Sequence, residues 1–461
     1  MRLWRAIPLF IMTAWGCNSS ADASRPAAAD YVADVPDIPM REYGARRAAA
    51  LEAFSDGILV LHARPAAKTM EQWGFVQDPT FQYFSGLTEV PGAILALDGP
   101  EGASHLFLPP APESFGMAVE GLVPEPGPMT ASRYEFDSAR PWTDFVDWLE
   151  GRVQAGAIIY LDGARRPEAT GSPNDLPPLA GDRTLWRSAI ATSFPSARIE
   201  SAKTEIMKMK SVKSNAEVAV LERNARMTVV SLLAVAERLR PGVRQRETEA
   251  AMVTTCLDVG GQGPSFWPWT MSGPNAHMGR LVGAFFRYDQ GDRIARPGEL
   301  VRVDVGCAGG AYGADVGRTL PVSGSFSEGQ AEAWNLLIAG YKAGLDTMSD
   351  GVTISAVRAA SIEAVRELQD DMVTAEGRAA ADAILSGGES VWHIHGVGIE
   401  SGEDIPPELR AGMVVAYEPG FSIGPDAYYL EDMILVTADG HRVLSEGLPY
   451  TAEEIALAMV R

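Results

Sequence analysis

The sequence predicts a two-domain α/β protein, and three observations support that prediction. The chain has 461 residues, and single hydrophobic cores stop growing at about 250–300 residues, so two domains are expected. In the first half, apolar runs of strand length alternate with helical stretches, as they do in α/β folds. The second half is rich in strand-like runs and adds helices near residues 205–239, 246–258, 328–346 and 352–369.

The first residues of the chain resemble a secretory signal and not a part of the fold. Arg2 and Arg5 precede an apolar run over residues 6–15, which is too short for a membrane span of about 20 residues. Gly16-Cys17 resembles a bacterial lipoprotein processing site, so a signal over residues 1–17 and a lipid anchor on Cys17 are expected. Residues 18–39 are predicted to be a flexible tether. We therefore expect an exported bacterial protein, either periplasmic or held at the membrane as a lipoprotein.

The first domain is predicted over residues 40–205 and the second over residues 206–461. A helix near Met40–Phe54 opens the first domain, and residues 162–182, dense in Pro, Gly, Asp and Arg, are predicted to be loop. The second domain begins on the long helix predicted over residues 205–239. The strands of the first domain are expected at 57–61, 81–86, 93–97 and 158–161.

The charge and the cysteines exclude several classes of function. Thirty-nine basic and sixty acidic residues give a net charge of −21, which argues against nucleic acid and anionic membranes as partners, because both are bound through Lys and Arg. Apart from Cys17, the chain has only Cys256 and Cys307. Two cysteines do not make a disulfide framework, and Cys307 is expected to be just a small buried residue.

A predicted β-hairpin places two aspartates close together. Arg302 and Asp304 share one face of a strand in which valines occupy the alternate positions. A two-residue turn at Gly309-Gly310 would bring Asp304 directly opposite Asp315, with Cβ atoms about 4.5–5.5 Å apart. Two carboxylates at that distance repel, so they either share a proton or hold a cation. A longer turn would shift the register and leave both aspartates as ordinary loop or surface groups.

Three further polar residues stand in apolar strands of the C-terminal part. His395 precedes Gly396, which allows close backbone approach, Glu418 ends an apolar strand, and Glu431 begins another. Charged groups in such runs are seldom left unpaired. With the aspartate pair they form an oxygen-rich set with one imidazole, which suits one or two ions of manganese, cobalt, iron or zinc better than calcium.

These residues lie in motifs that resemble the pita-bread metallopeptidases, a group that includes aminopeptidase P, prolidase and methionine aminopeptidase. Residues 73–93 and 213–217 are similar to the N-terminal domain and the junction helix of aminopeptidase P, so the resemblance covers nearly everything after about residue 40. Methionine aminopeptidases lack that first domain, which favours the proline-directed branch. The metal-site motifs are Val303–Gly306, Ala314–Thr319, His395–Ile399, Gly412–Gly420 and Leu430–Asp432.

The resemblance implies a pita-bread catalytic domain, preceded by a smaller mixed α/β domain, that binds two divalent metal ions. Manganese is expected, with cobalt or zinc as alternatives. Asp304 would bind one ion, Asp315 and Glu431 would bridge both, and His395 and Glu418 would complete the second. Glu418 would also accept and return the proton when a metal-bridging hydroxide attacks the peptide bond.

Three departures from the family pattern concern the substrate and not the metal. Gly402 stands where the family carries a second histidine, and Tyr429 where it carries an arginine. His277 lies closer to the preceding Asn275-Ala276 than the corresponding family histidine does. We expect His277 to take a catalytic and substrate-binding role, with His393 and Tyr429 also binding substrate.

The implied function is removal of the N-terminal residue from Xaa-Pro peptides by a metal-dependent aminopeptidase. One alternative is a prolidase that cuts only dipeptides. Others are a catalytically silent pita-bread binding module and a metal-free creatinase-like hydrolase, both of which are expected to lack this ligand set. The expected partners are a peptide substrate and, by analogy with the family, further copies of the chain in a homodimer or homotetramer.

Overall fold

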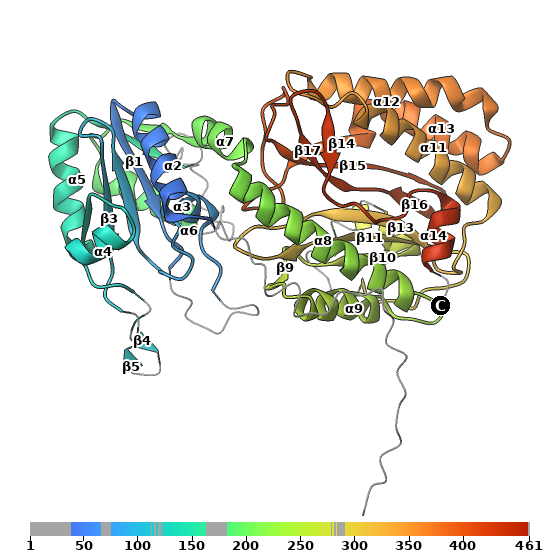
Figure 1. Cartoon of the computed structure of the whole chain (residues 1–461), viewed down its shortest axis with the longest axis horizontal. Coiled ribbons are helices and arrows are strands. Elements are labelled where there is room, and N and C mark those ends of the chain that lie inside the picture. The colour runs from blue at the N-terminus through green and yellow to red at the C-terminus, as the bar shows by residue number, and fades with distance from the viewer. Residues whose placement is uncertain are drawn as a thin grey trace, which may run out of the picture.

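The computed structural model describes residues 38–65, 75–111, 113–114, 117–118, 121, 123–162, 182–277, 279–280, 283 and 291–459. They form a smaller N-terminal unit and a larger C-terminal unit, with helix α7 (Lys203–Ser211) between them (Figure 1). The predicted signal, including Cys17, and tether residues 18–37 lie outside the described residues. None of the helices within the described ranges combines the length and the apolarity that crossing a bilayer requires.

The N-terminal unit is built on one six-stranded mixed sheet with the strand order β6-β3-β2-β1-β7-β8. Successive residues of β1 (Gly57–His62) point to opposite faces, so Leu59 packs into one apolar cluster and Ile58 into another. Both faces are covered, which explains why the strand is apolar throughout. The unit comprises α2 (Met40–Ala53), β1, α3 (Pro79–Ser85), β2 (Ile94–Asp98), β3 (Ala103–Leu108), β4 (Glu113–Ser114), β5 (Met117–Ala118), α4 (Pro128–Arg133), β6 (Ser138–Pro141), η1 (Trp142–Asp144), α5 (Phe145–Gln154), β7 (Ile158–Leu161), α6 (Asp182–Ser193) and β8 (Ile199–Ser201).

The strand predicted at residues 81–86 is wrong, because this segment belongs to helix α3. The Asp78 side chain caps the helix by accepting hydrogen bonds of 3.0 Å from the backbone N–H groups of Thr80 and Phe81. Pro79 occupies the first turn, and Gly86 ends the helix in the left-handed conformation with φ 71°. These signals for the start and end of a helix outweigh the preference of the aromatic residues between them for a strand.

The helix predicted over residues 205–239 is two helices, α7 and α8 (Asn215–Arg238). The break falls at Ser214, whose hydroxyl accepts from the Glu217 N–H at 3.2 Å while the Glu217 carboxylate accepts from the Ser214 N–H at 2.9 Å. This reciprocal capping box starts a new helix. The other three predicted helices of this half are confirmed, and α13 (Ala375–Gly387) was not predicted.

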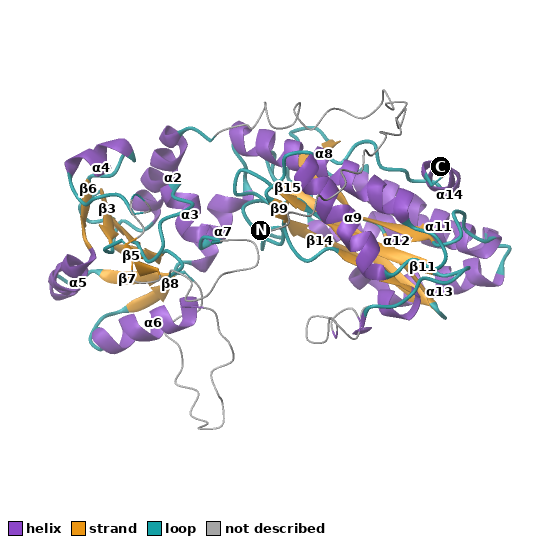
Figure 2. Ribbon diagram, turned by 90° about the horizontal axis from the view of Figure 1, so that it is seen from below, coloured by secondary structure: helices purple, strands orange, loops and turns teal. Residues whose placement is uncertain are grey.

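The C-terminal unit holds two larger sheets between two groups of helices, with α8 and α9 on one side and α11–α13 on the other (Figures 1 and 2), and β9 and β12 form a small two-stranded sheet. One larger sheet is β10-β11-β13; the other is β14-β15-β17-β18, with β16 paired to β15. Gly317 and Glu431 exchange backbone hydrogen bonds of 3.1 and 2.9 Å, which join the sheets. The remaining elements are α9 (Gln245–Asp258), β9 (Gly263–Pro264), β10 (Trp269–Ser272), η2 (Gly273–Ala276), β11 (Leu300–Val305), β12 (Cys307–Ala308), β13 (Val316–Pro321), α11 (Glu328–Leu345), α12 (Ile354–Leu368), η3 (Gln369–Asp371), η4 (Gly388–Val391), β14 (Trp392–Gly396), β15 (Val414–Ile423), β16 (Asp426–Tyr429), β17 (Asp432–Val436), β18 (His441–Val443) and α14 (Ala452–Ala458).

The predicted hairpin between β11 and β13 exists, but its register is different. The two turn residues with left-handed φ are Gly310 and Ala311, at 58° and 68°, so the turn lies one residue later than predicted. Asp304 therefore pairs with Gly317 and not with Asp315. Because the partner shifts by two positions, Asp304 and Asp315 keep to the same face of the hairpin. The direct pairing is wrong, and the two aspartates are diagonal neighbours instead.

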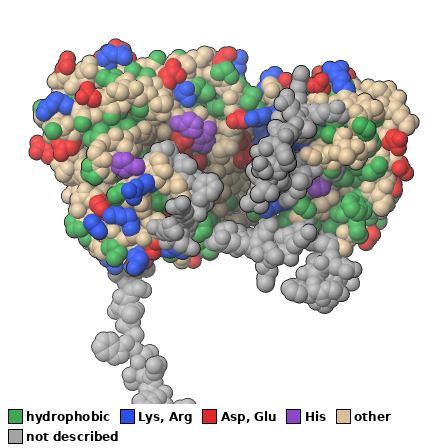
Figure 3. All heavy atoms as spheres, turned by 180° about the vertical axis from the view of Figure 1, so that it is seen from behind, with side chains coloured by type: hydrophobic (Ala, Val, Ile, Leu, Met, Phe, Trp, Pro, Cys, Tyr) green, Lys and Arg blue, Asp and Glu red, His purple; other side chains and the backbone are tan. Residues whose placement is uncertain are grey.

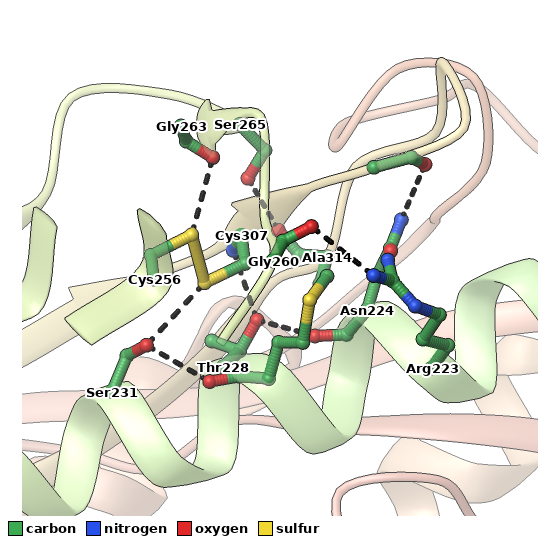
Figure 4. The surroundings of a disulfide bond; sticks show 12 residues. Arg223, Asn224, Thr228, Ser231, Cys256, Gly260, Gly263, Ser265, Cys307 and Ala314 are labelled. Atoms are coloured by element: carbon green, nitrogen blue, oxygen red, sulfur yellow. Dashed lines mark hydrogen bonds between the residues drawn. A yellow bond between two sulfur atoms is a disulfide. The ribbon is translucent and has the colours of Figure 1, made fainter. Parts of the chain in front are cut away.

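A disulfide joins Cys256 of α9 to Cys307 of β12, with the Cα atoms 5.9 Å apart (Figure 4). The expectation that Cys307 is only a small buried residue is therefore wrong. Helix α8 holds the same region: Thr228 Oγ1 accepts from the Cys307 N–H at 2.9 Å, and Asn224 Nδ2 donates to two carbonyls of the hairpin turn at 2.9 and 2.8 Å. The segment that follows Asp304 is thus fixed by a covalent bond and by α8.

Candidate metal centre

The polar residues singled out in the C-terminal half converge where the two sheets meet. Asp304 lies on β11, Asp315 just before β13, His395 on β14, Glu418 on β15, and Glu431 between β16 and β17. Two groups of three side chains each bring ligand atoms within 4.8 Å of one another, and His395 belongs to both. The groups are His393, His395 and Glu418, and Asp315, His395 and Glu431.

Glu418 lies between two imidazoles. It stands directly opposite His393 in the β14–β15 ladder; its Oε1 contacts His393 Nδ1 and lies 3.3 Å from His395 Nε2. Burial raises the pKa of Glu418, but the two histidines outweigh burial and hold that pKa well below its usual range. Burial lowers the pKa of His395, but Glu418 and Glu431 raise it to about 9. The register of two neighbouring strands therefore creates an ionised carboxylate beside imidazole nitrogens.

Asp315 and Glu431 are buried carboxylates that repel each other. Their relative exposures are 8% and 0%. The pKa of Asp315 is raised well above its ordinary value by burial and by the charges of Glu431 and Asp304. The pKa of Glu431 is raised in the same way by burial and by the charges of Glu418 and Asp304. These mutual effects place Asp304 in the same electrostatic cluster.

Asp304 is held by Arg302, and Tyr429 lies among the carboxylates. Arg302 Nη2 donates a 2.8 Å hydrogen bond to Asp304 Oδ2. The Tyr429 hydroxyl is 2.7 Å from both Glu418 Oε2 and Glu431 Oε2. Burial and the neighbouring carboxylates raise the pKa of Tyr429 well above its ordinary value, so the hydroxyl keeps its proton and can donate it to one carboxylate at a time.

A buried ion pair fixes the backbone of Glu431. Arg318 Nη1 donates to the Glu431 carbonyl at 2.8 Å, and Arg318 Nη2 donates to the two carboxylate oxygens of Asp432 at 3.0 and 3.2 Å. Tyr341 and Ser445 also donate to Asp432, at 2.8 and 2.6 Å. Asp432 is as buried as Glu431, but both of its carboxylate oxygens accept hydrogen bonds from protein donors. Asp432 therefore stabilises the packing, whereas Glu431 remains able to bind a cation.

Two observations show that divalent ions fit this set of residues. Asp315 Oδ1 and Glu431 Oε1 are buried and have no hydrogen-bond partner among the described residues, whereas buried polar atoms normally have one. Carboxylate oxygens with an imidazole nitrogen are the donors that manganese, iron, cobalt and zinc accept. A cation would also relieve the repulsion that raises the pKa values of the two acids.

A cavity of about 340 Å³ opens beside this centre. Its polar residues include Glu418, His393 and Tyr429, while Phe421 and Tyr428 contribute a stacked aromatic pair with ring centroids 4.8 Å apart. His393 is 58% exposed, and histidine side chains lie next to acidic ones on the face of the larger unit seen in Figure 3. The cavity is large enough for a small ligand.

The structure brings together most of the predicted site residues but leaves His277 outside them. Asp315, His395, Glu418 and Glu431 bring their ligand atoms together, Asp304 acts electrostatically on Asp315 and Glu431, and His393 and Tyr429 line the cavity. His277 follows η2, is half-buried and acts electrostatically on Asp426. It is not among the described residues that line the cavity, so its catalytic role stays a prediction.

Arg302 was not predicted to belong to the site. The sequence does carry a signal for it, because Arg302 shares a strand face with Asp304 and interrupts a run of valines. Its position above Tyr429 follows only from the packing of β11 against β16.

Two protein-family profiles match the chain, and they divide it as the two units do. The profile of metallopeptidase family M24 matches residues 219–438, and the profile of the aminopeptidase P N-terminal domain matches residues 43–160. The chain thus carries an M24 metallopeptidase domain in its larger unit and an aminopeptidase P N-terminal domain in its smaller unit. It is therefore an enzyme of the metallopeptidase class, and the predicted resemblance to the pita-bread metallopeptidases is confirmed.

Relatives of known structure confirm the fold. The chain is 28% identical over 455 residues to the Xaa-Pro aminopeptidase of Escherichia coli K12, covering 92% of this chain and 98% of that one. Proline aminopeptidase P II from Yersinia pestis superposes with a TM-score of 0.72 at 20% identity, covering 92% and 99% of the two chains. Zinc-substituted E. coli aminopeptidase P in complex with product gives 0.71 at 21% identity, covering 92% and 98%. The predicted mixed α/β domain followed by a pita-bread domain is thus observed.

Proposed function

We propose that this M24 enzyme is an aminopeptidase that uses two divalent metal ions to release the N-terminal residue from Xaa-Pro peptides. The observation that carries the proposal is that Asp315, Glu418 and Glu431 converge on His395 beside a cavity, within reach of the charge of Asp304. The preference for proline is supported by the E. coli relative, which is a Xaa-Pro aminopeptidase, and by the match to the aminopeptidase P N-terminal domain.

The residues that would hold the ions are Asp304, Asp315, His395, Glu418 and Glu431, with manganese as the first candidate. When bound, such ions lower the pKa of a water molecule toward neutrality and polarise the scissile carbonyl. Asp315 Oδ1 and Glu431 Oε1, which have no hydrogen-bond partner among the described residues, would gain an interaction from a cation. The Tyr429 hydroxyl orients the carboxylates of Glu418 and Glu431, donating its proton to one of them at a time.

Glu418 has the properties of the proton carrier. Its pKa lies below the usual range, so it is ionised at neutral pH and can accept the proton of the attacking water. It lies in the wall of the cavity and can pass that proton to the leaving nitrogen, as a general acid–base group does. His393, in contact with Glu418 Oε1, orients that carboxylate.

Two alternatives use the same residues differently. A prolidase-like dipeptidase would share the whole centre and differ only in the length of peptide that it accepts. A catalytically silent binding module would have no use for the buried carboxylates, whose mutual repulsion destabilises the fold unless a cation or protons are bound. The convergence of all five predicted ligands therefore favours an enzyme.

The test combines metal analysis with peptide hydrolysis. After reconstitution with manganese, we expect two ions per chain by elemental analysis and release of the first residue from Xaa-Pro peptides. Glu418→Gln should abolish turnover while most of the metal is retained. Glu408→Gln, which changes an exposed carboxylate paired with Arg410, is the matched control and should keep activity. A reconstituted protein without bound metal would contradict the proposal.

A further inference from the structure

Arg302 is a buried cation that the steps above do not use. It lies on β11, the central strand of its sheet, and its side chain is only 7% exposed. A buried charge is costly unless hydrogen bonds satisfy it. Arg302 Nη2 donates to Asp304, but Arg302 Nε has no hydrogen-bond partner among the described residues. A guanidinium has five donors, so Asp304 engages only part of its capacity.

The guanidinium is held in a fixed position by Tyr429. Arg302 Cζ lies 3.6 Å from the centroid of the Tyr429 ring. Stacking on an aromatic face leaves the terminal N–H groups of an arginine free to donate in the guanidinium plane, whereas Arg302 Nε is buried. Thr319 Oγ1 accepts from the Tyr429 N–H at 2.7 Å. A Cβ atom on Gly317 would lie 2.2 Å from the ring, so only glycine at this position leaves room for the Tyr429 ring. Arg302 is thus positioned before any ligand arrives.

Arg302 also lines the cavity beside the metal centre. It is the only lysine or arginine among the described residues that line this cavity. Phe421 and Tyr428 form an apolar wall of the cavity, and Glu418 lines the part of the cavity next to the metal centre. A cavity with these three features suits the end of a short peptide, which combines a reactive amide, an apolar ring and a terminal carboxylate.

We propose that Arg302 binds the free C-terminal carboxylate of the substrate and thereby makes the site prefer Xaa-Pro dipeptides over longer or amidated peptides. This inference rests on the proposed function. A hydrogen bond from a guanidinium to a carboxylate is charge-assisted and roughly twice as strong as one between neutral groups. A longer peptide or a C-terminal amide offers only a neutral carbonyl oxygen at that place, so it gains less from Arg302.

The test compares an Xaa-Pro dipeptide with its C-terminal amide. In the manganese-loaded wild type, kcat/KM for the acid should exceed that for the amide by about ten- to a hundredfold, the range for a hydrogen bond to a charged group. Arg302→Met should reduce this ratio to near one. Arg302→Lys should give an intermediate ratio, because lysine keeps the positive charge but cannot donate two parallel hydrogen bonds to a carboxylate. Arg442→Met is the matched control: this exposed arginine pairs with Glu222, so its loss should leave the ratio unchanged.

A binding measurement provides a readout that does not depend on turnover. In the Glu418→Gln background, calorimetric titration should show the same preference for the acid over the amide, and adding Arg302→Met should remove it. Equal loss of both ligands in the Arg302 variants would mean that Arg302 only holds Asp304, and this would overturn the inference. A wild type that cleaves acid and amide equally well would also overturn it while leaving the proposed function intact. A wild type that cleaves neither would refute the proposed function itself.

Discussion

Glu431 and Asp432 are adjacent acids that are both 0% exposed, yet the structure predicts opposite consequences for their loss. Glu431 Oε1 has no hydrogen-bond partner among the described residues, and the pKa of Glu431 lies well above its ordinary value. A raised pKa means that the stability contributed by the protonated form is complete at low pH and is lost as the pH rises through the folded-state pKa. In the metal-free protein at neutral pH, Glu431→Gln should therefore leave the melting temperature equal to or above that of the wild type.

The difference appears when metal is added. An ion at about a hundredfold excess over its Kd stabilises the folded state by about 2.7 kcal/mol. For a unit of this size, about 1 kcal/mol shifts the melting temperature by about 2–4 °C, so the wild type should gain roughly 5–10 °C with manganese. Glu431→Gln removes a ligand and should lose this gain.

Asp432→Asn is the matched control in the neighbouring position. It leaves Arg318, which is 0% exposed, without its charged partner, and breaking such a buried pair costs about 3–5 kcal/mol. The melting temperature should fall by roughly 10 °C, while the gain with manganese should persist. Differential scanning calorimetry with chelator and with manganese measures both quantities. A Glu431→Gln protein that gains as much from manganese as the wild type would refute the assignment of Glu431 as a ligand.

Three further changes test the packing of the larger unit. Gly317→Ala should displace the Tyr429 ring, which a Cβ would approach to 2.2 Å, and overpacking of about 1–3 kcal/mol should appear as a lower melting temperature and weaker manganese binding in a titration. Burial raises the pKa of Glu249 to about 8, so Glu249→Gln should stabilise the protein in urea unfolding by a few kcal/mol at pH 9 but not at pH 4, where both proteins are neutral at this position. Replacing Cys256 and Cys307 with serine removes a cross-link between residues 51 apart, which should cost roughly 4 kcal/mol and make the unfolding midpoint insensitive to reductant; a midpoint equal to that of the oxidised wild type would contradict a stabilising role.

Much of the fold could be predicted from the sequence because its signals are local. The apolar run 57–61 predicts a buried strand from its composition alone, and the predicted helices at 246–258, 328–346 and 352–369 carry their own start and stop residues. The two wrong predictions of secondary structure each involve a local helix cap. Asp78 starts a helix at 79, and the Ser214–Glu217 box divides the helix predicted over 205–239.

The candidate ligands could also be recognised from the sequence, because a carboxylate in an apolar strand is unusual enough to need a partner. Which groups face one another could not, since the contacts join segments far apart in the chain. A turn displaced by one residue changed the partner of Asp304 to Gly317. The stacking of Arg302 on Tyr429 and the disulfide from Cys256 to Cys307 depend on how α9, β11, β12 and β16 pack.

The residue types available for catalysis, and the strands that carry them, can therefore be read from the chain alone. Their geometry depends on tertiary packing: one carboxylate lies between two imidazoles, two repelling acids have oxygens without a hydrogen-bond partner among the described residues, and an arginine lies beside the cavity. Strand and helix preferences act over a few residues, whereas pKa shifts and interaction partners arise from groups that the packing of distant segments brings within a few ångströms.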